Sequence, residues 1–400
     1  MPLLHIFNPG HETAVLLDSV SYTPPANVGV MTDDLACLPM WYAESEDAVL
    51  VDRMVDEDFI NSLPKEIGRF ATVVTKDSFN RWGSSPHSFV AKPWGMSPHI
   101  LNKFRRLRSK ESLLTVPVWD DKLKQLTGRQ TAIECFSKMK QLMPSYSLPD
   151  IPECCNTVEA VECLLQQWEL PLVVKTPYSS SGRGIMWLRN ITLADAERKW
   201  ISGAILKQGF VSVERGLEKV VDFAMEFDLD KGGNISYEGL SLFSTEGKGA
   251  YTGNRLANQD TLRKEITDLV SDADLSMVQT IVRDVLQEFY VPYYSGCIGV
   301  DMMVYRKADN SLAIHPCVEI NMRYTMGMVA LQLFKRYVSP FAEGTFLVSF
   351  HKKVGMALDK HHELTRLYPL QIEQGKIVQG YLSLCPVNLH TNYCSYIIIG

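Results

Sequence analysis

One hairpin-like stretch limits the fold of this chain most strongly. Residues 299 to 327 have the sequence GVDMMVYRKADNSLAIHPCVEINMRYTMG, in which two apolar runs flank a polar turn. The turn at Ala308 to Ser311 predicts a pair of antiparallel strands, because Asp, Asn and Ser favour tight turns. Folding the stretch at this turn sets Asp301 opposite Val318 or Glu319.

The polar side chains of this hairpin indicate a metal site. Glu319 and Asn321 are two residues apart and share a face with Asp301, and cross-strand neighbours lie about 4.5 to 5.5 Å apart at Cβ. Two carboxylates that close repel each other unless a cation lies between them. One or two carboxylates with substrate phosphates are usual ligands of Mg²⁺, and an Asn carbonyl oxygen is an acceptable third. The alternative, an exposed polar strand face, is weakened by the apolar neighbours Cys317, Val318, Ile320 and Met322.

A second stretch predicts a phosphate-binding loop. Residues 173 to 188, VVKTPYSSSGRGIMWL, fit neither GxxxxGK[ST] nor GxGxxG, and Lys175 ends one apolar strand while GIMWL forms a second. The small side chains and backbone N–H groups of the hairpin tip suit a polyphosphate, and Lys175 and Arg183 add charge-assisted hydrogen bonds. An exposed hairpin without a ligand is the alternative for this loop taken alone. The loop residues assigned to phosphate are Ser179, Ser180, Ser181, Gly182, Arg183 and Gly184.

The first 120 residues alternate short apolar runs with helical stretches, which predicts βαβ units on a parallel sheet. Ligands of such sheets meet the loops after the strands, so we expect Asn8, Gly10, His11 and Glu12 to lie near a ligand. A turn that merely begins a helix explains these residues nearly as well. Residues 85 to 98 are predicted to form a long loop, and the basic NKFRRLRSK at 102 to 110 a solvated helix face or a phosphate contact.

Composition bounds the kind of protein. With 400 residues and 46% hydrophobic content, the chain should form two or three packed units of about 100 to 200 residues each. Its net charge of -6 argues against a general nucleic-acid binder. We expect a cytoplasmic, soluble protein without a membrane partner, because the sequence shows neither a signal-like leader nor an apolar run near ~20 residues. The nine cysteines show no zinc-ligand spacing, so reduced thiols are expected.

The order of these motifs resembles that of the ATP-grasp superfamily. A lysine at a strand end, a Ser/Gly hairpin, a VER hinge, an aspartate on a strand and Glu-x-Asn-x-Arg follow one another over roughly residues 129 to 330. The resemblance implies an α/β fold: two α+β subdomains clamping ATP, preceded by an N-terminal parallel α/β domain of pre-ATP-grasp type. The implied domains are residues 1–127, 128–205 with the phosphate lid, and 206–400 with the hinge, the metal-binding strands and the C-terminal segment.

The resemblance also implies roles for individual residues. Lys175 matches the lysine that holds the α/β-phosphates, and the Ser/Gly loop matches the flexible lid. Asp222 stands where the family commonly has a ribose-binding Glu, and Arg129 stands in place of a second phosphate-binding lysine. Arg323 matches the arginine that steadies the reacting centre, so Arg323 and Lys175 are the implied catalytic residues. The implied adenine hinge is Val213, Glu214 and Leu217, and the implied magnesium ligands are Asp301, Glu319 and Asn321.

The function implied is an ATP- and Mg²⁺-dependent ligase, with Mn²⁺ as a further candidate metal. It would activate a small-molecule carboxylate as an acyl phosphate, join it to an amine or similar nucleophile, and release ADP and phosphate. A phosphotransferase on the same scaffold and a non-catalytic nucleotide-binding protein are the alternatives, and a homodimer is a candidate assembly. Candidate substrate contacts are His11, Glu12, Lys248 and Arg255.

Overall fold

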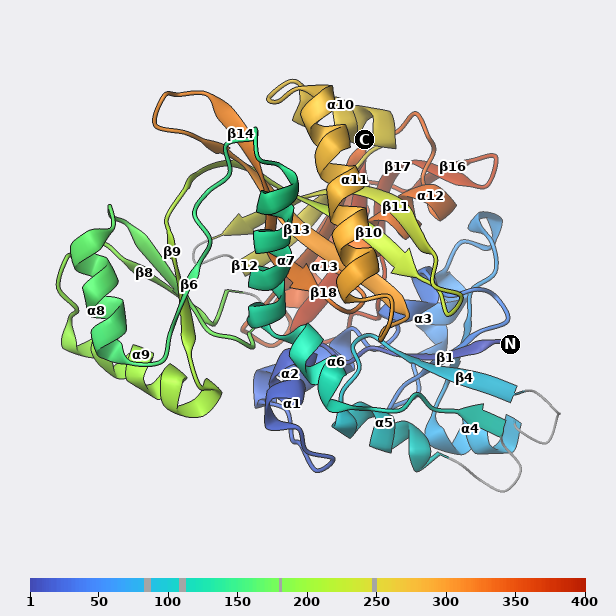
Figure 1. Cartoon of the computed structure of the whole chain (residues 1–400). Coiled ribbons are helices and arrows are strands. Elements are labelled where there is room, and N and C mark those ends of the chain that lie inside the picture. Colours follow the sequence, from blue (N-terminus) through green and yellow to red (C-terminus); the bar gives the residue numbers. More distant parts are fainter. Residues whose placement is uncertain (83–87, 108–112, 180–181, 247–249) are drawn as a thin grey trace. The chain divides into compact units, whose positions relative to one another are not determined.

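The computed structural model describes residues 1–82, 88–107, 113–179, 182–246 and 250–400 (Figure 1). Its chain divides into two compact units. Unit 1 is Met1–Trp119 with Thr252–Thr261 and Arg323–Gly400, and unit 2 is Asp120–Tyr251 with Leu262–Met322. Both units are therefore discontinuous in sequence, whereas the domains expected above follow the chain. Within the described ranges, no helix combines the length and apolarity needed to cross a bilayer.

Unit 1 begins with the predicted parallel sheet. Its strands run in the order β3-β2-β1-β4-β5, with parallel pairing throughout. This order places β1 in the centre, with β2 on one side and β4 on the other. The strands are β1 (Leu3–Ile6), β2 (Ala48–Leu50), β3 (Thr72–Val74), β4 (Ser88–Pro93) and β5 (Leu113–Thr115). The helices between them are α1 (His11–Leu17), α2 (Ala26–Asp34), α3 (Glu57–Ser62), α4 (Lys76–Trp82) and α5 (Pro98–Arg105), with short 3-10 turns at Leu38–Trp41 and Lys65–Ile67.

The prediction of a long loop over residues 85 to 98 was wrong, because Ser88–Pro93 forms β4. Its side chains alternate between partly buried and buried, and Phe89, Ala91 and Pro93 are the buried ones. Lysine and proline at its end obscured this alternation. The proline is tolerated because it is the last residue of the strand, where Trp94 instead donates its backbone N–H to the carbonyl of Ile6 at 2.9 Å.

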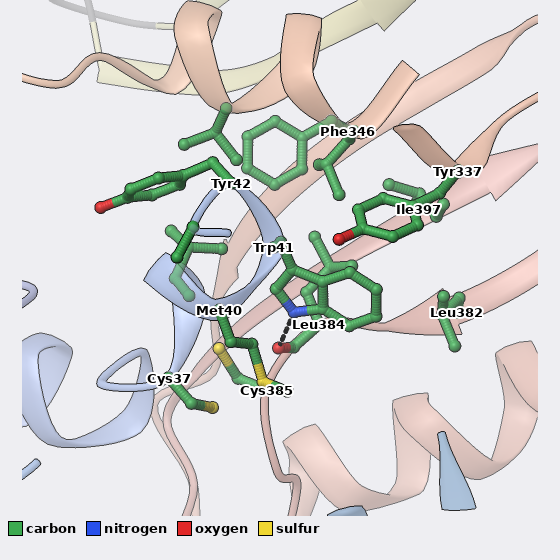
Figure 2. Packing of buried hydrophobic residues seen from close by; sticks show 14 of the residues in the cluster. Cys37, Met40, Trp41, Tyr42, Tyr337, Phe346, Leu382, Leu384, Cys385 and Ile397 are labelled. Atoms are coloured by element: carbon green, nitrogen blue, oxygen red, sulfur yellow. Dashed lines mark hydrogen bonds between the residues drawn. The ribbon is translucent and has the colours of Figure 1, made fainter. Parts of the chain in front are cut away.

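The last part of the chain, together with β12 from the middle of the chain, completes unit 1 with antiparallel strands in the order β12-β15-β18-β17-β16. It packs through a shared core on the 3-10 turn that contains Trp41 (Figure 2). The Trp41 indole N–H donates to the carbonyl of Leu384 at 2.6 Å. Burying so large an aromatic ring stabilises the unit by roughly 4 to 6 kcal/mol at about 25 cal/mol per Å². The elements are β12 (Ala250–Leu256), α12 (Met326–Tyr337), β15 (Gly344–Phe350), α13 (Met356–Leu367), β16 (Gln371–Glu373), β17 (Lys376–Ser383) and β18 (Tyr393–Ile399).

Unit 2 contains an antiparallel sheet covered by two helices. Its strands run β14-β13-β10-β11, and α7 (Arg129–Leu142) and α11 (Asp272–Phe289) pack over it (Figure 1). The Tyr290 hydroxyl at the end of α11 donates to the carbonyl of Leu126 at 3.1 Å, which ties this helix to the chain before α7. The strands are β10 (Glu218–Leu229), β11 (Ile235–Glu246), β13 (Gly296–Arg306) and β14 (Leu312–Asn321). Two further helices are α6 (Asp121–Thr127) and α10 (Gln259–Thr267), the latter lying in unit 2 from Leu262 on.

A second sheet of unit 2, with the order β6-β9-β7-β8, carries the predicted phosphate loop. Helices α8 (Val158–Gln167) and α9 (Asp195–Gln208) pack on it through a shared apolar core (Figure 1). The predicted hairpin is confirmed, because β7 and β8 pair antiparallel with Lys175 opposite Ile185. Its strands are β6 (Glu153–Cys155), β7 (Leu172–Lys175), β8 (Ile185–Leu188) and β9 (Val211–Arg215).

Candidate active site

The β13–β14 hairpin brings the predicted metal donors of unit 2 together. Asp301 pairs directly with Glu319 across the strands, which decides between the two registers expected from the sequence. The Asn321 amide donates to Asp301 Oδ2 at 3.0 Å, so all three side chains lie on one face. Among the described residues, no group of three His, Cys, Asp or Glu side chains is arranged to hold a metal. The donors fit Mg²⁺ only when the Asn321 oxygen and substrate phosphates complete the set.

Arg129 joins this hairpin to the phosphate loop. It is the first residue of α7 and is 8% exposed. Its Nη2 donates to Glu319 Oε1 at 2.9 Å, and its Nε donates to the carbonyl of Thr176 at 3.2 Å. A second guanidinium nitrogen, Nη1, donates to the carbonyl of Val318 at 3.4 Å. This cation therefore lies against a predicted metal ligand and against the base of the loop, and its predicted role in phosphate binding stays a prediction.

Lys175 and the predicted hinge are neighbours. The Lys175 ammonium forms an ion pair with the Glu214 carboxylate, and the side chains are 7% and 19% exposed. Their strands are adjacent, since β7 pairs with β9 and places Val174 opposite Val213. Leu217 follows β9 directly before β10 begins. The structure thus places a buried lysine beside the hinge residues.

His315 on β14 is a buried neutral side chain that the sequence analysis missed. Burial lowers its pKa to about 4, although the charge of Glu214 acts in the opposite direction. Its ring stacks on Phe136 of α7 with ring centres 4.7 Å apart, and its Nδ1 accepts from the Cys317 N–H at 3.3 Å. Only its apolar surroundings in sequence could have pointed to it.

The phosphate loop has a tight base. The Thr176 N–H donates to the carbonyl of Gly184 at 2.9 Å. A Cβ at position 184 would lie 2.2 Å from Thr176 Oγ1 and 2.4 Å from Ser179 Cβ, so only glycine fits. Gly182 adopts the left-handed conformation with φ +70°, and Arg183 is exposed. The predicted ligands Ser180, Ser181 and Lys248 lie outside the described residues.

Two predicted contacts are engaged by other side chains. Asp222 on β10 forms an ion pair with Lys219 and accepts from the Thr245 hydroxyl at 3.0 Å, so its ribose role stays a prediction. Arg255, in unit 1, forms an ion pair with Glu343. Its predicted role as a substrate contact also stays a prediction.

In unit 1, the carboxyl ends of β1 and β4 are joined by polar contacts. Strand order reverses between β1 and β4, which is where sheets of this type bind ligands. The Asn8 amide donates to the carbonyl of Gly95 at 2.7 Å and its Oδ1 accepts from the Gly95 N–H at 3.3 Å. Gly10, with φ +69°, then turns the chain into α1.

The buried side chains of His11 and Glu12 and the partly buried Arg323 form a cluster beside this junction. Arg323 Nε donates to Glu12 Oε1 at 2.7 Å, and His11 Nδ1 lies 3.4 Å from the same oxygen. Burial alone would raise the pKa of Glu12, but the charges of His11 and Arg323 hold it well below its usual range. A Cβ on Gly95 would lie 2.4 Å from the His11 ring, so glycine is required there. Within the described part of the chain, His11 Nε2 and Glu12 Oε2 accept or donate no hydrogen bond.

Arg323 is held beside two aromatic residues, Trp94 and Tyr324. The Tyr324 N–H donates to the carbonyl of Trp94 at 2.9 Å, and Arg323 Nη1 donates to the carbonyl of Tyr324 at 3.0 Å. The Tyr324 ring stacks on Tyr42 with centres 4.4 Å apart, and Lys92 Nζ lies 5.7 Å from the Tyr324 ring centre. The sequence analysis missed Trp94 and Tyr324 as site residues. Their signal was a Trp-Gly pair directly after a strand and a Tyr directly after Arg323.

Comparison with solved structures shows the same architecture in several enzymes. Biotin carboxylase from Campylobacter jejuni, in a β,γ-ATP complex, matches with a TM-score of 0.52 and 8% identity over 99% of this chain and 87% of that chain. N5-carboxyaminoimidazole synthetase from Staphylococcus aureus, complexed with ADP, matches with a TM-score of 0.50 and 10% identity over 100% and 94%. The biotin carboxylase domain of 2-oxoglutarate carboxylase from Hydrogenobacter thermophilus, a dimer with MgADP, ADP and bicarbonate, matches with a TM-score of 0.51 and 11% identity over 89% and 81%.

The chain shares the mixed α/β fold of these enzymes, with a parallel N-terminal sheet and antiparallel sheets after it, which is the fold that the resemblance to the ATP-grasp superfamily implied. No protein-family model matches the sequence. No curated protein matches it by sequence either. At identities of 8 to 11%, the solved structures show the fold alone. The function is therefore inferred from the residues of the site.

Proposed function

We propose that the protein is an ATP- and Mg²⁺-dependent ligase that activates a small-molecule carboxylate and joins it to an amine or similar nucleophile. One observation carries the proposal: within unit 2, Arg129 contacts both the Asp301–Glu319 hairpin and the base of the phosphate loop. A metal-bound triphosphate requires cations beside a closely packed, glycine-containing loop, and it requires paired carboxylates, here on adjacent strands.

The residues have separate tasks in this proposal. Asp301, Glu319 and Asn321 would hold Mg²⁺, which when bound supplies positive charge to the phosphate oxygens. Lys175 and Arg129 hold the phosphates, and Glu214 orients the Lys175 ammonium through their ion pair. The backbone of Val213 and Leu217 meets the adenine, and Asp222 meets the ribose. The loop from Ser179 to Gly184, of which Ser180 and Ser181 lie outside the described residues, would keep the lid role that the resemblance implies, covering the phosphates and excluding water.

The proposed reaction has two steps. A carboxylate oxygen of the substrate attacks the γ-phosphorus of ATP, the bond to the β,γ-bridging oxygen breaks, and an acyl phosphate and ADP form. The amine nitrogen then attacks the carbonyl carbon, the C–O bond to phosphate breaks, and the amine loses a proton as phosphate leaves. Arg323 is proposed to stabilise the charge on the transferring group, because a guanidinium offers planar, paired donors.

Trapping the activated acid tests the reaction directly. Purified protein is incubated with ATP, Mg²⁺ and fractionated small-molecule extract, with hydroxylamine present, and both ADP and hydroxamate are measured. Hydroxamate that appears together with ADP supports carboxylate activation, and the active fraction identifies the acid. ADP with a phosphorylated product but no hydroxamate would instead favour the phosphotransferase alternative.

Glu319→Ala separates this site from unrelated ATP hydrolysis. We expect the variant to lose magnesium-dependent turnover, because it removes one carboxylate donor and the ion pair that this carboxylate forms with Arg129. Glu218→Ala is the matched control, since Glu218 pairs with Arg306 at 3.0 Å on the same sheet but is 70% exposed. Unchanged turnover in Glu319→Ala, or equal loss in both variants, would refute the metal assignment.

A further inference from the structure

A cleft of about 330 Å³ opens in unit 1 at the carboxyl ends of β2 and β3. Asp52 follows β2 and Lys76 follows β3, and α5 with the residue after it forms the opposite wall. Parallel sheets of this kind bind ligands outside the carboxyl ends of their strands. The volume lies at the small end of the range for small-molecule sites, about 300 to 1,000 Å³.

The wall formed by α5 is polar because its polar residues recur at helical spacing. His99, Asn102, Lys103 and Arg106 stand at positions i, i+3, i+4 and i+7, which lie on one face of a helix. The other face of α5 is apolar and buried in the core of unit 1 through Ile100, Leu101 and Phe104. These four polar side chains therefore all line the cleft. A helix face that only contacts solvent would not need to lie against a cleft.

The side chains of the cleft carry a surplus of positive charge. Asp52 is its one carboxylate among the described lining residues, and it forms an ion pair with Lys103 at 2.7 Å. Lys76 and Arg106 have no ion-pair partner in the described part of the chain, so two positive charges remain uncompensated. This local surplus contrasts with the net charge of -6 of the whole chain. A dianion would neutralise it.

The groups around these two cations hold the wall in place. His99 Nδ1 lies 3.3 Å from the carbonyl of Val20, and the His99 ring meets Tyr22 edge-on at 5.7 Å. The Asp52–Lys103 pair links the helix to the end of β2. The cleft is thus bounded by side chains with fixed partners, while the unpaired Lys76 and Arg106 are left for a ligand.

From this arrangement we infer that the cleft binds the phosphate group of a small phosphorylated molecule. A phosphomonoester carries about two negative charges at neutral pH and accepts several hydrogen bonds, which matches Lys76, Arg106 and the Asn102 amide. The inference goes beyond the proposed ligase reaction, because it requires neither ATP nor magnesium. It defines a second anion site, in unit 1, that is distinct from the nucleotide site proposed for unit 2.

Phosphate binding to the purified full chain tests this inference. Inorganic phosphate is the probe, followed by ³¹P NMR line broadening at low salt. We expect Lys76→Gln and Arg106→Gln each to weaken binding about tenfold or more, since each removes a charge-assisted contact. Rising NaCl should weaken binding to the wild-type protein, because an exposed ionic contact is screened.

Two further variants keep the result specific. Arg366→Gln removes an exposed arginine from α13 of the same unit and should leave phosphate binding unchanged. Lys175→Met should remove phosphate binding at the proposed nucleotide site while leaving the cleft intact. The inference is overturned if phosphate does not bind, if both cleft variants bind like wild type, or if only Lys175→Met reduces binding. If Arg106→Gln still binds ATP, then the cleft of unit 1 and the proposed nucleotide site of unit 2 can be disrupted independently.

Discussion

Glu12 and Arg323 are 311 residues apart in sequence, yet their side chains form a partly buried ion pair at 2.7 Å. We expect Glu12→Gln to lower kcat roughly 10- to 100-fold with little change in the ATP dissociation constant, because a misplaced guanidinium can cost about 10²-fold. In the proposed reaction, Glu12 would be a positioning residue for Arg323. The measurements are steady-state kinetics for kcat and KM and equilibrium titration with ATP.

The matched control for this prediction is Glu44→Gln. Glu44 also pairs with an arginine of unit 1, Arg336, but its side chain is 62% exposed. Exposed ion pairs contribute little, so the control should keep wild-type kinetics and stability. If Glu12→Gln lowered ATP affinity as strongly as kcat, the positioning role would be wrong, and equal kinetics in all three proteins would exclude it altogether.

At the scale of single elements, the base of the phosphate loop depends on Gly184. A Cβ there would lie 2.2 Å from Thr176 Oγ1 and 2.4 Å from Ser179 Cβ, so Gly184→Ala must displace the residues at the base of the loop, between β7 and β8. Overpacking of this kind costs about 1 to 3 kcal/mol. We expect ATP affinity to fall about tenfold or more, measured by titration calorimetry.

Gly203→Ala is the control for the same substitution in the same unit. Gly203 lies inside α9, and a Cβ there would meet nothing within 4 Å. Alanine in a helix interior is favoured over glycine by about 1 kcal/mol, so this variant should be more stable and bind ATP normally. Wild-type ATP affinity in Gly184→Ala would mean that the loop base does not shape the nucleotide site.

Elements with a short-range pattern could be predicted from the sequence, and elements defined by distant partners could not. The period of two in Glu319 and Asn321 and the turn before them predicted the β13–β14 hairpin, including its two candidate registers. In contrast, β4 was predicted as a loop, since its partner β1 lies more than eighty residues earlier. The pairing of Arg129 with Glu319 was not visible, because no local pattern connects residues 190 apart.

For the whole molecule, buried ionisable groups predict a decline of stability in mild acid. The pKa of His315 is lowered from 6.5 to about 4 by burial, so the unfolded chain binds its proton first as pH falls. The contribution of neutral His315 to the free energy of unfolding is fully present above pH 6.5. It is lost between pH 6.5 and about 4, by at most about 1.4 kcal/mol per pH unit. Hydrogen exchange at α7 and β14 measures this loss in unit 2.

His315→Gln removes the titrating ring and should flatten the pH dependence in that window, whatever its effect on stability at pH 8. Glu12 gives unit 1 a second pH range in which stability falls. Its pKa is held well below its usual 4.5, so its contribution to the free energy of unfolding is lost only below that pH. On acidification, hydrogen exchange in unit 2 should therefore respond to His315 at a higher pH than exchange in unit 1 responds to Glu12. An unchanged slope in His315→Gln would assign the acid sensitivity to other groups.

The Trp41–Leu384 hydrogen bond spans 343 residues, and this separation matters while the protein is being made. Translation proceeds at about 5 to 20 residues per second, so the ribosome needs roughly 20 to 70 s to supply Leu384 after Trp41 has emerged. Unit 2 ends at Met322 and is fully synthesised before unit 1, although unit 1 contains the first residue of the chain. The aromatic surface around Trp41 must therefore stay without its native cover during most of synthesis.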